Sequence, residues 1–259
     1  QSELADTIYY NGKVITVNDK QPKATVVAVK DGKILYVGDI RGSKPLTSES
    51  TKKVDLAGKT MVPGFVDAHG HVVSAGIQAA SANLLPMPDG SVNNFNELSD
   101  VMSSWGNSEA GKIFIDNTGW LVGFGFDDSQ LAEQLFPTAE TLNAINDKKP
   151  MMIIHQSGHF GVFNQQALDK AGIDDCTKKV SGGVIRCKAD GVTPNGVLEE
   201  NAFFSALAIF QANVDDAYNL ELFSKGMHSF ARFGYTTAQE GRAFAPTLVV
   251  AEAKANGMA

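Results

Sequence analysis

The sequence predicts an α/β protein: a small antiparallel, sandwich-like β domain at residues 1–62, then about half of a TIM-like (β/α) barrel at residues 63–259. Short runs rich in Val, Ile and Tyr, separated by turn dipeptides, fill the first part. Strand and helix patterns alternate in the second part, which is typical of βα units around a parallel sheet. A closed barrel needs eight units and about 250 residues, and about four are recognisable, so we expect the chain to stop halfway round.

The first part is predicted to consist of short strands joined by tight turns. Asn11-Gly12 and Asp31-Gly32 are strong signals for two-residue hairpin turns. A polar, loop-like stretch follows at residues 40–52, and Thr60–Val62 then leads into Pro63-Gly64. The expected strands are Thr7–Tyr10, Lys13–Val17, Thr25–Lys30 and Lys33–Val37.

The second part is predicted to alternate between strands and helices. Its strands are short apolar runs, and its helices carry capping residues or helical spacing of apolar side chains. We expect strands at Phe65–Ala68, within Lys112–Trp120, at Met151–His155 and at Tyr235–Gln239. We expect helices at Thr138–Asn146, Asn164–Ala171, 215–233 and Pro246–Ala255.

Composition argues against two classes of partner. The net charge is −7 and the pI is about 5.2, so the chain lacks the basic surface that a nucleic-acid-binding protein needs. Its apolar runs fall short of the roughly 18–20 residues that cross a membrane. We therefore expect neither a nucleic-acid partner nor a membrane span.

The two cysteines leave a disulfide and two free thiols both open. Cys176 and Cys187 have ten residues between them, and no Cys-x-x-Cys pattern is present. They would pair in an oxidising compartment and stay reduced in the cytosol. Because the chain begins at Gln1 without a charged leader, and because of this possible disulfide, we expect a periplasmic or secreted protein, with the cytoplasm as the alternative.

The segment Pro63–His71 carries the clearest chemical signal. Alternate side chains of a strand point to the same face, so Asp67, His69 and His71 are expected on one side. Neutral imidazoles are good ligands for zinc and similar metals. We therefore predict that His69 and His71 bind a divalent metal, with zinc as the expected ion. Asp67 either orients one of these rings or makes a buried structural hydrogen bond.

Several further segments, together with the His-x-His segment, give the chain a family resemblance. It resembles the YtcJ-like amidohydrolases (the amidohydrolase 3 family) of the amidohydrolase superfamily, over nearly its whole length. These segments are Phe124–Asp128, Leu135–Thr138, Gln156–Asn164, Ala167–Leu168, Ala171–Ile173, Asp190-Gly191 and Pro194–Ala202.

The resemblance implies a distorted TIM barrel beside a β-sandwich, and hydrolysis of an amide-like C–N bond, for example in an N-substituted amide or formamide. Members of this family are about twice as long as this chain. They take two more histidine ligands and a catalytic aspartate from late barrel strands. The last histidine here is His228, so we expect a truncated fragment that binds metal weakly and is inactive.

Two acids compete for a further role as metal ligand. Glu200 stands where the family carries an acidic residue, and its alternative is an exposed acid at a helix N-terminus. Glu240 follows the strand Tyr235–Gln239, and its alternative is a capping or ion-paired carboxylate. Glu199 is a weaker candidate than either.

The remaining histidines differ in their expected roles. The family pattern has Gly-His at Gly158-His159, so we expect His159 to act near the substrate as a catalytic hydrogen-bond donor. Its alternative is a loop histidine that orders nearby backbone. His155 ends a predicted strand and is expected to be structural.

A non-catalytic binding or regulatory protein on the same fold is the alternative function, because fold does not fix function. The exposed strand edges of a half barrel favour self-association, so we also expect a homodimer.

Overall fold

The computed structural model describes residues 3–242. The chain divides into two compact units, with the boundary between Val66 and Asp67. The helix expected at Pro246–Ala255 lies outside the described residues. Each unit is described by itself below.

The first unit contains two small mixed sheets. In one, the strand order is β5-β4-β1-β6, and in the other it is β3-β2-β7. The prediction of an antiparallel domain is only partly right, because β1 pairs with β6, and β2 with β7, in parallel. The strands of this unit are β1 (Thr7–Tyr10), β2 (Lys13–Ile15), β3 (Lys23–Ala24), β4 (Val26–Lys30), β5 (Lys33–Gly38), β6 (Lys52–Asp55), β7 (Thr60–Met61) and β8 (Phe65–Val66).

The two predicted hairpin turns have different outcomes. Asp31-Gly32 joins the antiparallel pair β4 and β5, and both residues have positive φ, as a type I′ turn requires. Asn11-Gly12 instead joins strands of different sheets, and the Asn11 side chain donates to Asp55. The hairpin expected there is wrong, because β1 and β2 each find their partners elsewhere in the chain.

The stretch predicted as loop at residues 40–52 contains short helical turns. Asp39 starts the first of them, because its carboxylate accepts hydrogen bonds from the N–H groups of Arg41 and Gly42. These turns are α1 (Ile40–Ser43) and the 3₁₀ helix η1 (Lys44–Leu46).

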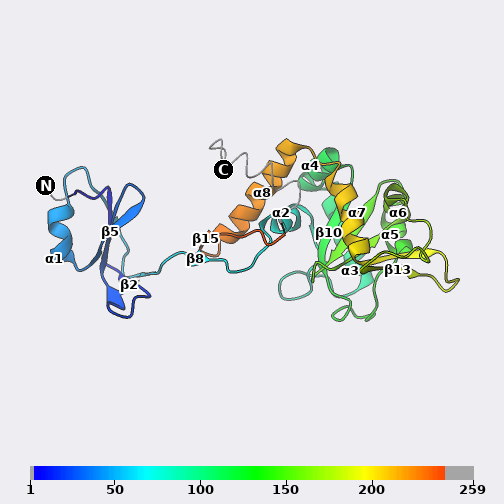
Figure 1. Ribbon diagram of the computed structural model, residues 1–259, viewed down its shortest axis with the longest axis horizontal. Helices are drawn as coiled ribbons and strands as arrows, with labels where there is room; N and C mark the ends of the chain where they lie inside the picture. The colour runs from blue at the N-terminus through cyan, green and yellow to red at the C-terminus, as the bar shows by residue number, and fades with distance from the viewer. Residues whose placement is uncertain (1–2, 243–259) are drawn as a thin grey trace. The chain divides into compact units, whose positions relative to one another are not determined.

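A six-stranded mixed sheet forms the centre of the second unit (Figure 1). Its strand order is β13-β14-β12-β11-β10-β9. The strands β9, β10 and β11 run parallel, whereas β12, β14 and β13 follow in antiparallel pairs. These strands are β9 (Ala82–Asn83), β10 (Leu121–Phe126), β11 (Met151–His155), β12 (Phe160–Phe163), β13 (Gly183–Cys187) and β14 (Pro194–Glu200). A short strand, β15 (Tyr235–Thr237), comes after them in the chain.

Both faces of this sheet are buried, and this explains the apolar run of β11. Met152 and Ile154 pack into one core with helix α7 (Asn201–Gln211), whereas Met151 and Ile153 pack into a second core with helix α3 (Phe95–Asn107). Successive side chains of a strand point to opposite faces, so a strand covered on both sides must be apolar throughout. The predicted strand Met151–His155 is confirmed for this reason.

Seven helices of the described residues cover this unit. The predicted helices at residues 138–146, 164–171 and 215–233 are confirmed, and Asn164 caps its helix as expected. The helices are α2 (Val72–Ala80), α3 (Phe95–Asn107), α4 (Glu109–Thr118), α5 (Ala139–Ile145), α6 (Gln165–Ala171), α7 (Asn201–Gln211) and α8 (Asp216–Ala231).

One strand prediction of this part is wrong, and a second is right only in part. The run Ile113–Ile115 lies in helix α4, which Ser108 caps through the N–H of Gly111, and the strand follows it at Leu121–Phe126. The strand at Phe65–Val66 exists but is not buried, since 52% and 66% of these residues are exposed. A short apolar run does not distinguish a helix from a buried strand.

Helices α2 and α8 lie side by side (Figure 1). A Cβ atom on Gly76 of α2 would lie 1.9 Å from the carbonyl oxygen of Leu222 in α8, and one on Gly226 would lie 2.1 Å from that of Val72. The two glycines therefore allow the helix backbones to touch. This contact fixes α2, which begins directly after His71.

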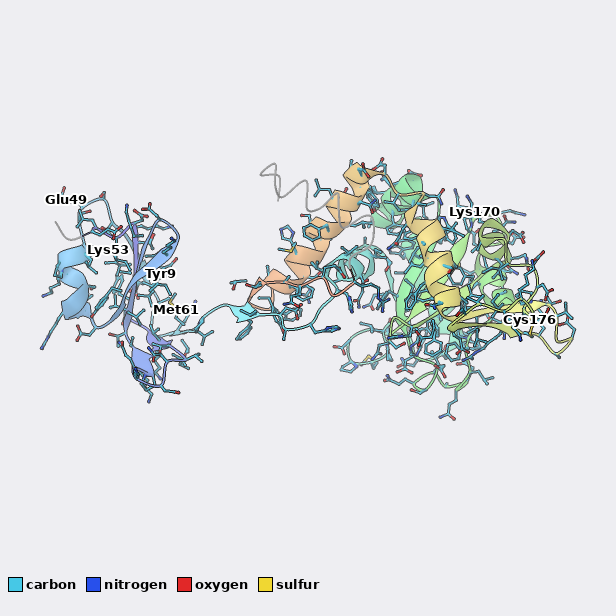
Figure 2. The ribbon with its side chains drawn as sticks, in the orientation of Figure 1. Tyr9, Glu49, Lys53, Met61, Lys170 and Cys176 are labelled. Carbon is cyan, nitrogen blue, oxygen red and sulfur yellow. A yellow bond between two sulfur atoms is a disulfide. The ribbon has the colours of Figure 1, made fainter. Side chains whose placement is uncertain are left out.

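A disulfide joins Cys176 to Cys187, whose Cα atoms are 5.4 Å apart. It ties the loop after α6 to the end of β13, and Figure 2 labels Cys176 there. No helix among residues 3–242 is both long enough and apolar enough to span a membrane.

Candidate metal centre and adjoining cavity

Asp67 braces the segment that carries the two histidines. It is 8% exposed, and its carboxylate accepts hydrogen bonds from the N–H groups of His69 and Gln239. The N–H of Asp67 also donates to the carbonyl of Thr237. These bonds hold residues 67–71 beside residues 237–241. Asp67 thus makes the buried structural hydrogen bonds that were one of its two expected roles.

The imidazole rings of His69 and His71 lie next to each other, on the same side of the chain. Their centroids are 5.2 Å apart and their planes are nearly perpendicular. A Cβ atom on Gly241 would lie 3.3 Å from Cε1 of His69 and 3.2 Å from Cε1 of His71. Both rings therefore converge on this glycine, which leaves the space between them open.

Glu240 orients His71 and caps helix α2. One carboxylate oxygen lies 3.3 Å from Nδ1 of His71 and accepts the N–H of Arg242 at 2.9 Å, and the other accepts the N–H of Val73 in the first turn of α2 at 2.9 Å. An ionised carboxylate only accepts hydrogen bonds, so Nδ1 of His71 carries the proton. Its Nε2 atom is left with a free lone pair, as in a histidine that binds a metal.

A cavity of about 310 Å³ adjoins these groups. His71 and Glu240 lie at its wall, together with His159 and Arg242. The rest of the wall is largely apolar. Its apolar residues are Val73, Ala75, Ile77, Phe124, Ile154, Phe203, Leu207 and Phe230, and its further polar residues are Ser74, Gln78, Gln156, Ser157 and Gln211. The cavity can therefore take an apolar group beside a polar edge.

His159 and Glu200 form a pair at this polar edge. Nδ1 of His159 lies 2.9 Å from Oε2 of Glu200, and the N–H of Glu200 donates to the carbonyl of His159. Glu200 has φ +48° and ψ −123°, a conformation that costs a non-glycine residue on the order of 1–3 kcal/mol. The structure brings together these two predicted site residues and holds one of them under strain, which is common at functional sites.

Asp127, Asp128 and His155 form a second cluster of ligand-type groups. Among residues 3–242, these three offer one ligand atom each within 4.8 Å of one another. They follow or end the neighbouring parallel strands β10 and β11. Partial burial pushes the pKa of Asp127 up, but hydrogen bonds from Ser129 and Gln130 outweigh it and hold the pKa below its ordinary value. Asp127 is therefore ionised at neutral pH.

The hydrogen bonds of His155 turn its proton toward the two aspartates. The N–H of Ser157 donates to Nδ1 of His155 at 3.1 Å, so the proton of the neutral ring sits on Nε2. Nε2 lies 3.3 Å from Asp128 and 3.8 Å from Asp127. In this arrangement the ring donates to carboxylates. A metal can bind Nε2 only if the proton sits on Nδ1 instead, and Ser157, whose N–H donates to Nδ1, would then have to move.

Sequence reasoning missed Asp127, Asp128 and Arg242 as site residues. With the strand at residues 121–126 correctly placed, both aspartates would have followed its carboxyl end, next to the end of β11. This edge of a parallel sheet is where functional side chains gather. Arg242 had no signal in the sequence, because its place beside the cavity depends on contacts between distant segments.

Comparison with known proteins identifies the family. The model of the amidohydrolase 3 family, described as an amidohydrolase family, matches residues 52–257. The chain belongs to the amidohydrolase family. The predicted YtcJ-like relationship is confirmed, and the family match begins in the first unit and continues through the second.

Curated amidohydrolase relatives include proteins with different names. The chain is 30% identical to the exoenzymes regulatory protein AepA of Pectobacterium carotovorum subsp. carotovorum, over 98% of this chain and 53% of that protein. It is 29% identical to the N-substituted formamide deformylase of Arthrobacter pascens, over 91% of this chain and 42% of that protein. The chain thus spans about half the length of these relatives.

A solved amidohydrolase-like structure has the same fold. It is an uncharacterized metal-dependent hydrolase from Pyrococcus horikoshii, with a TM-score of 0.67 at 21% identity, over 97% of this chain and 46% of that one. At this level of identity the likeness shows a shared fold.

Proposed function

We propose that the protein is a metal-dependent hydrolase that cleaves a C–N bond in an amide-like substrate. One observation carries this proposal: the rings of His69 and His71 converge, and Glu240 leaves Nε2 of His71 free. The donor set fits a zinc-type ion, because imidazole nitrogens supported by a carboxylate are common ligands for it.

The residues around the pair would divide the work of the site. His69 and His71 would hold the metal, which supplies a water of lowered pKa and polarises the scissile carbonyl. Glu240, predicted from sequence as a ligand, has both oxygens in hydrogen bonds, and we assign it the positioning of His71. His159 would donate a hydrogen bond to the substrate from the cavity wall, oriented by Glu200.

Glu200 remains a candidate ligand as well as a partner of His159. Its carboxylate is 47% exposed and its strained backbone sets the side chain at the end of β14. If Glu200 were a metal ligand, its carboxylate would no longer hold His159, and the imidazole would be free to contact substrate. We therefore keep both roles for Glu200 in this proposal.

The whole protein is proposed to complete the barrel. The match to a longer metal-dependent hydrolase covers 97% of this chain and 46% of that one. The further histidine ligands and the general-acid or general-base aspartate expected from the family are proposed to come from other parts of the barrel. The disulfide supports an oxidising compartment, such as the periplasm, and exposed apolar residues such as Val66 and Phe233 support self-association into a dimer.

A regulatory protein without catalysis is the second candidate. The observation that favours it is the 30% identity to a protein named as a regulator of exoenzymes. In that case the cavity would bind a small amide-like effector. Hydrolysis by the intact protein distinguishes the two functions.

Metal content and turnover test the main proposal together. The protein is purified without chelator or histidine tag, and its metal is measured by elemental analysis beside hydrolysis of N-substituted formamides. We expect bound divalent metal, and its loss in His69→Ala and His71→Ala. His228→Ala is the matched control, because this ring contacts its own helix at Ser224 and lies outside the cavity. Retention of metal in both His69→Ala and His71→Ala would show the proposal to be wrong.

A further inference from the structure

Arg242 carries a positive charge at the cavity wall that no described carboxylate neutralises. Its residue is half-buried, and it lines the cavity together with His71, His159 and Glu240. Among residues 3–242, no ion pair within 4.0 Å joins its guanidinium to an acid, whereas Arg186 pairs with Glu199. An unpaired charge at the edge of an apolar cavity favours a ligand of opposite charge.

The guanidinium of Arg242 has a fixed place. It lies 4.3 Å from the ring centroid of Phe204, a distance at which an aromatic face attracts a cation. The edge of the same ring faces His159, with centroids 6.1 Å apart. Phe204 therefore holds Arg242 and His159 on one platform, close to the polar edge of the cavity.

The acids near this platform already have partners. Glu200 pairs with His159, and Glu240 accepts hydrogen bonds from His71, Val73 and the backbone of Arg242. Both carboxylate oxygens of Glu240 take part in these hydrogen bonds, and among residues 3–242 no ion pair within 4.0 Å joins Glu240 to the guanidinium. The charge of Arg242 thus remains available to a ligand.

We propose that Arg242 binds the carboxylate of the substrate, so that the site selects N-acylated amino acids whose acyl group is apolar. A planar guanidinium matches a carboxylate with two parallel hydrogen bonds. The apolar wall would take the acyl group, and the amide would lie between them, toward His71 and His159. This inference rests on the proposed function for the amide bond, but the charge recognition itself needs no metal and no turnover.

Binding of two matched ligands tests the inference. Hippurate (N-benzoylglycine) and its neutral carboxamide, hippuramide, differ in the carboxylate alone. Their affinities for the full chain are measured by calorimetry in the presence of chelator, so that a metal cannot bind the carboxylate. We expect hippurate to bind at least tenfold more tightly than hippuramide, and Arg242→Gln to remove that preference.

Arg232→Gln is the matched control. Arg232 also lies over an aromatic ring, 4.6 Å from the centroid of Phe233, but it is exposed and lies outside the cavity. We expect this variant to keep the preference for hippurate. Phe204→Leu, which removes the platform and leaves the charge, is expected to reduce the preference several-fold.

Four results would overturn the inference: no saturable binding of hippurate, equal affinities of the two ligands for the wild type, an unchanged preference in Arg242→Gln, or an equal loss in Arg232→Gln. Thermal unfolding of each variant confirms that it is folded. Hydrolysis is measured in a separate experiment, so a protein that prefers hippurate through Arg242 but hydrolyses no amide would contradict the proposed function alone.

Discussion

Single residues decide the chemistry of this site through their hydrogen bonds. His71 and His155 both contact carboxylates, but with opposite consequences for their second nitrogen. Glu240 fixes the proton of His71 on Nδ1, whereas the N–H of Ser157 requires a lone pair on Nδ1 of His155. The free lone pair of His71 is therefore the better prepared for a metal, even though three ligand atoms gather more closely around His155.

Glu240 is predicted to tune metal affinity from outside the coordination sphere. Replacing a carboxylate that orients a metal-binding histidine costs roughly 10–100-fold in affinity. We expect Glu240→Ala to weaken metal binding by that factor, measured by competition with a chromophoric chelator, and Glu240→Gln to lose less, because its amide oxygen still accepts a hydrogen bond from His71. If Glu240 were instead a direct metal ligand, both variants would lose most of the protein's affinity for the metal.

Glu200 is predicted to carry backbone strain that glycine would relieve. Its φ of +48° is a conformation that glycine adopts readily. Both Glu200→Gly and Glu200→Ala lose the contact with His159, so the difference between their stabilities reports on strain in the backbone. We expect Glu200→Gly to be the more stable by about 1 kcal/mol in urea unfolding. Equal stability of the two variants would show that the backbone is relaxed.

Whole elements position the site, and the sequence revealed them unevenly. Helices with a capping residue and a helical period, such as α6 after Asn164, could be predicted to within a residue or two. The strand β10 could not, because the apolar run Ile113–Ile115 looks equally like a strand. The structure makes that run helical through the Ser108 cap and buries Phe114 against Phe210 and Tyr218. Tertiary packing thus decided what the local pattern left open.

The contact between α2 and α8 is predicted to tolerate no side chain at Gly76. A Cβ atom there meets backbone of α8 at 1.9 Å, so the helices would have to separate. Overpacking of this kind costs typically 1–3 kcal/mol, and we expect Gly76→Ala to lower the free energy of unfolding by that amount. Gly106→Ala in α3 is the control, since its Cβ atom would meet only Leu121 at 3.4 Å. A similar loss in both variants would argue against the helix contact as the cause.

The turn between β13 and β14 is predicted to lose stability in acid. Hydrogen bonds from the hydroxyl of Thr193, and from the N–H groups of Val192 and Thr193, lower the pKa of Asp190 from 3.8 to about 2. A lowered pKa in the folded state stabilises the fold above pH 3.8, and that contribution disappears as the pH falls through about 2. We expect the difference in urea midpoint between wild type and Asp190→Asn to shrink over this range. A constant difference would exclude the ionised carboxylate as its source.

At the scale of the whole molecule, the family and the paired histidines could be read from the sequence, but the assembly of the site could not. Asp67, His69 and His71 are four residues or fewer apart, and the sequence could place them together, although the strand whose periodicity was used ends at Val66. Glu240 reaches His71 from 169 positions later in the chain. No local pattern predicts such a contact, and it determines which imidazole nitrogen is free.

Residues 3–242 therefore offer two candidate metal positions, and mutations distinguish between them. Because Nε2 of His71 has a free lone pair whereas Nε2 of His155 carries the proton, we expect bound metal to depend on His71 and not on Asp128. We expect His71→Ala to reduce the metal content strongly and Asp128→Asn to leave it unchanged, by elemental analysis of matched preparations. Loss of metal in Asp128→Asn alone would move the centre to the ends of β10 and β11. Partial loss in both variants would indicate two metals, in which case Ser157 must turn away from His155 when its ion binds.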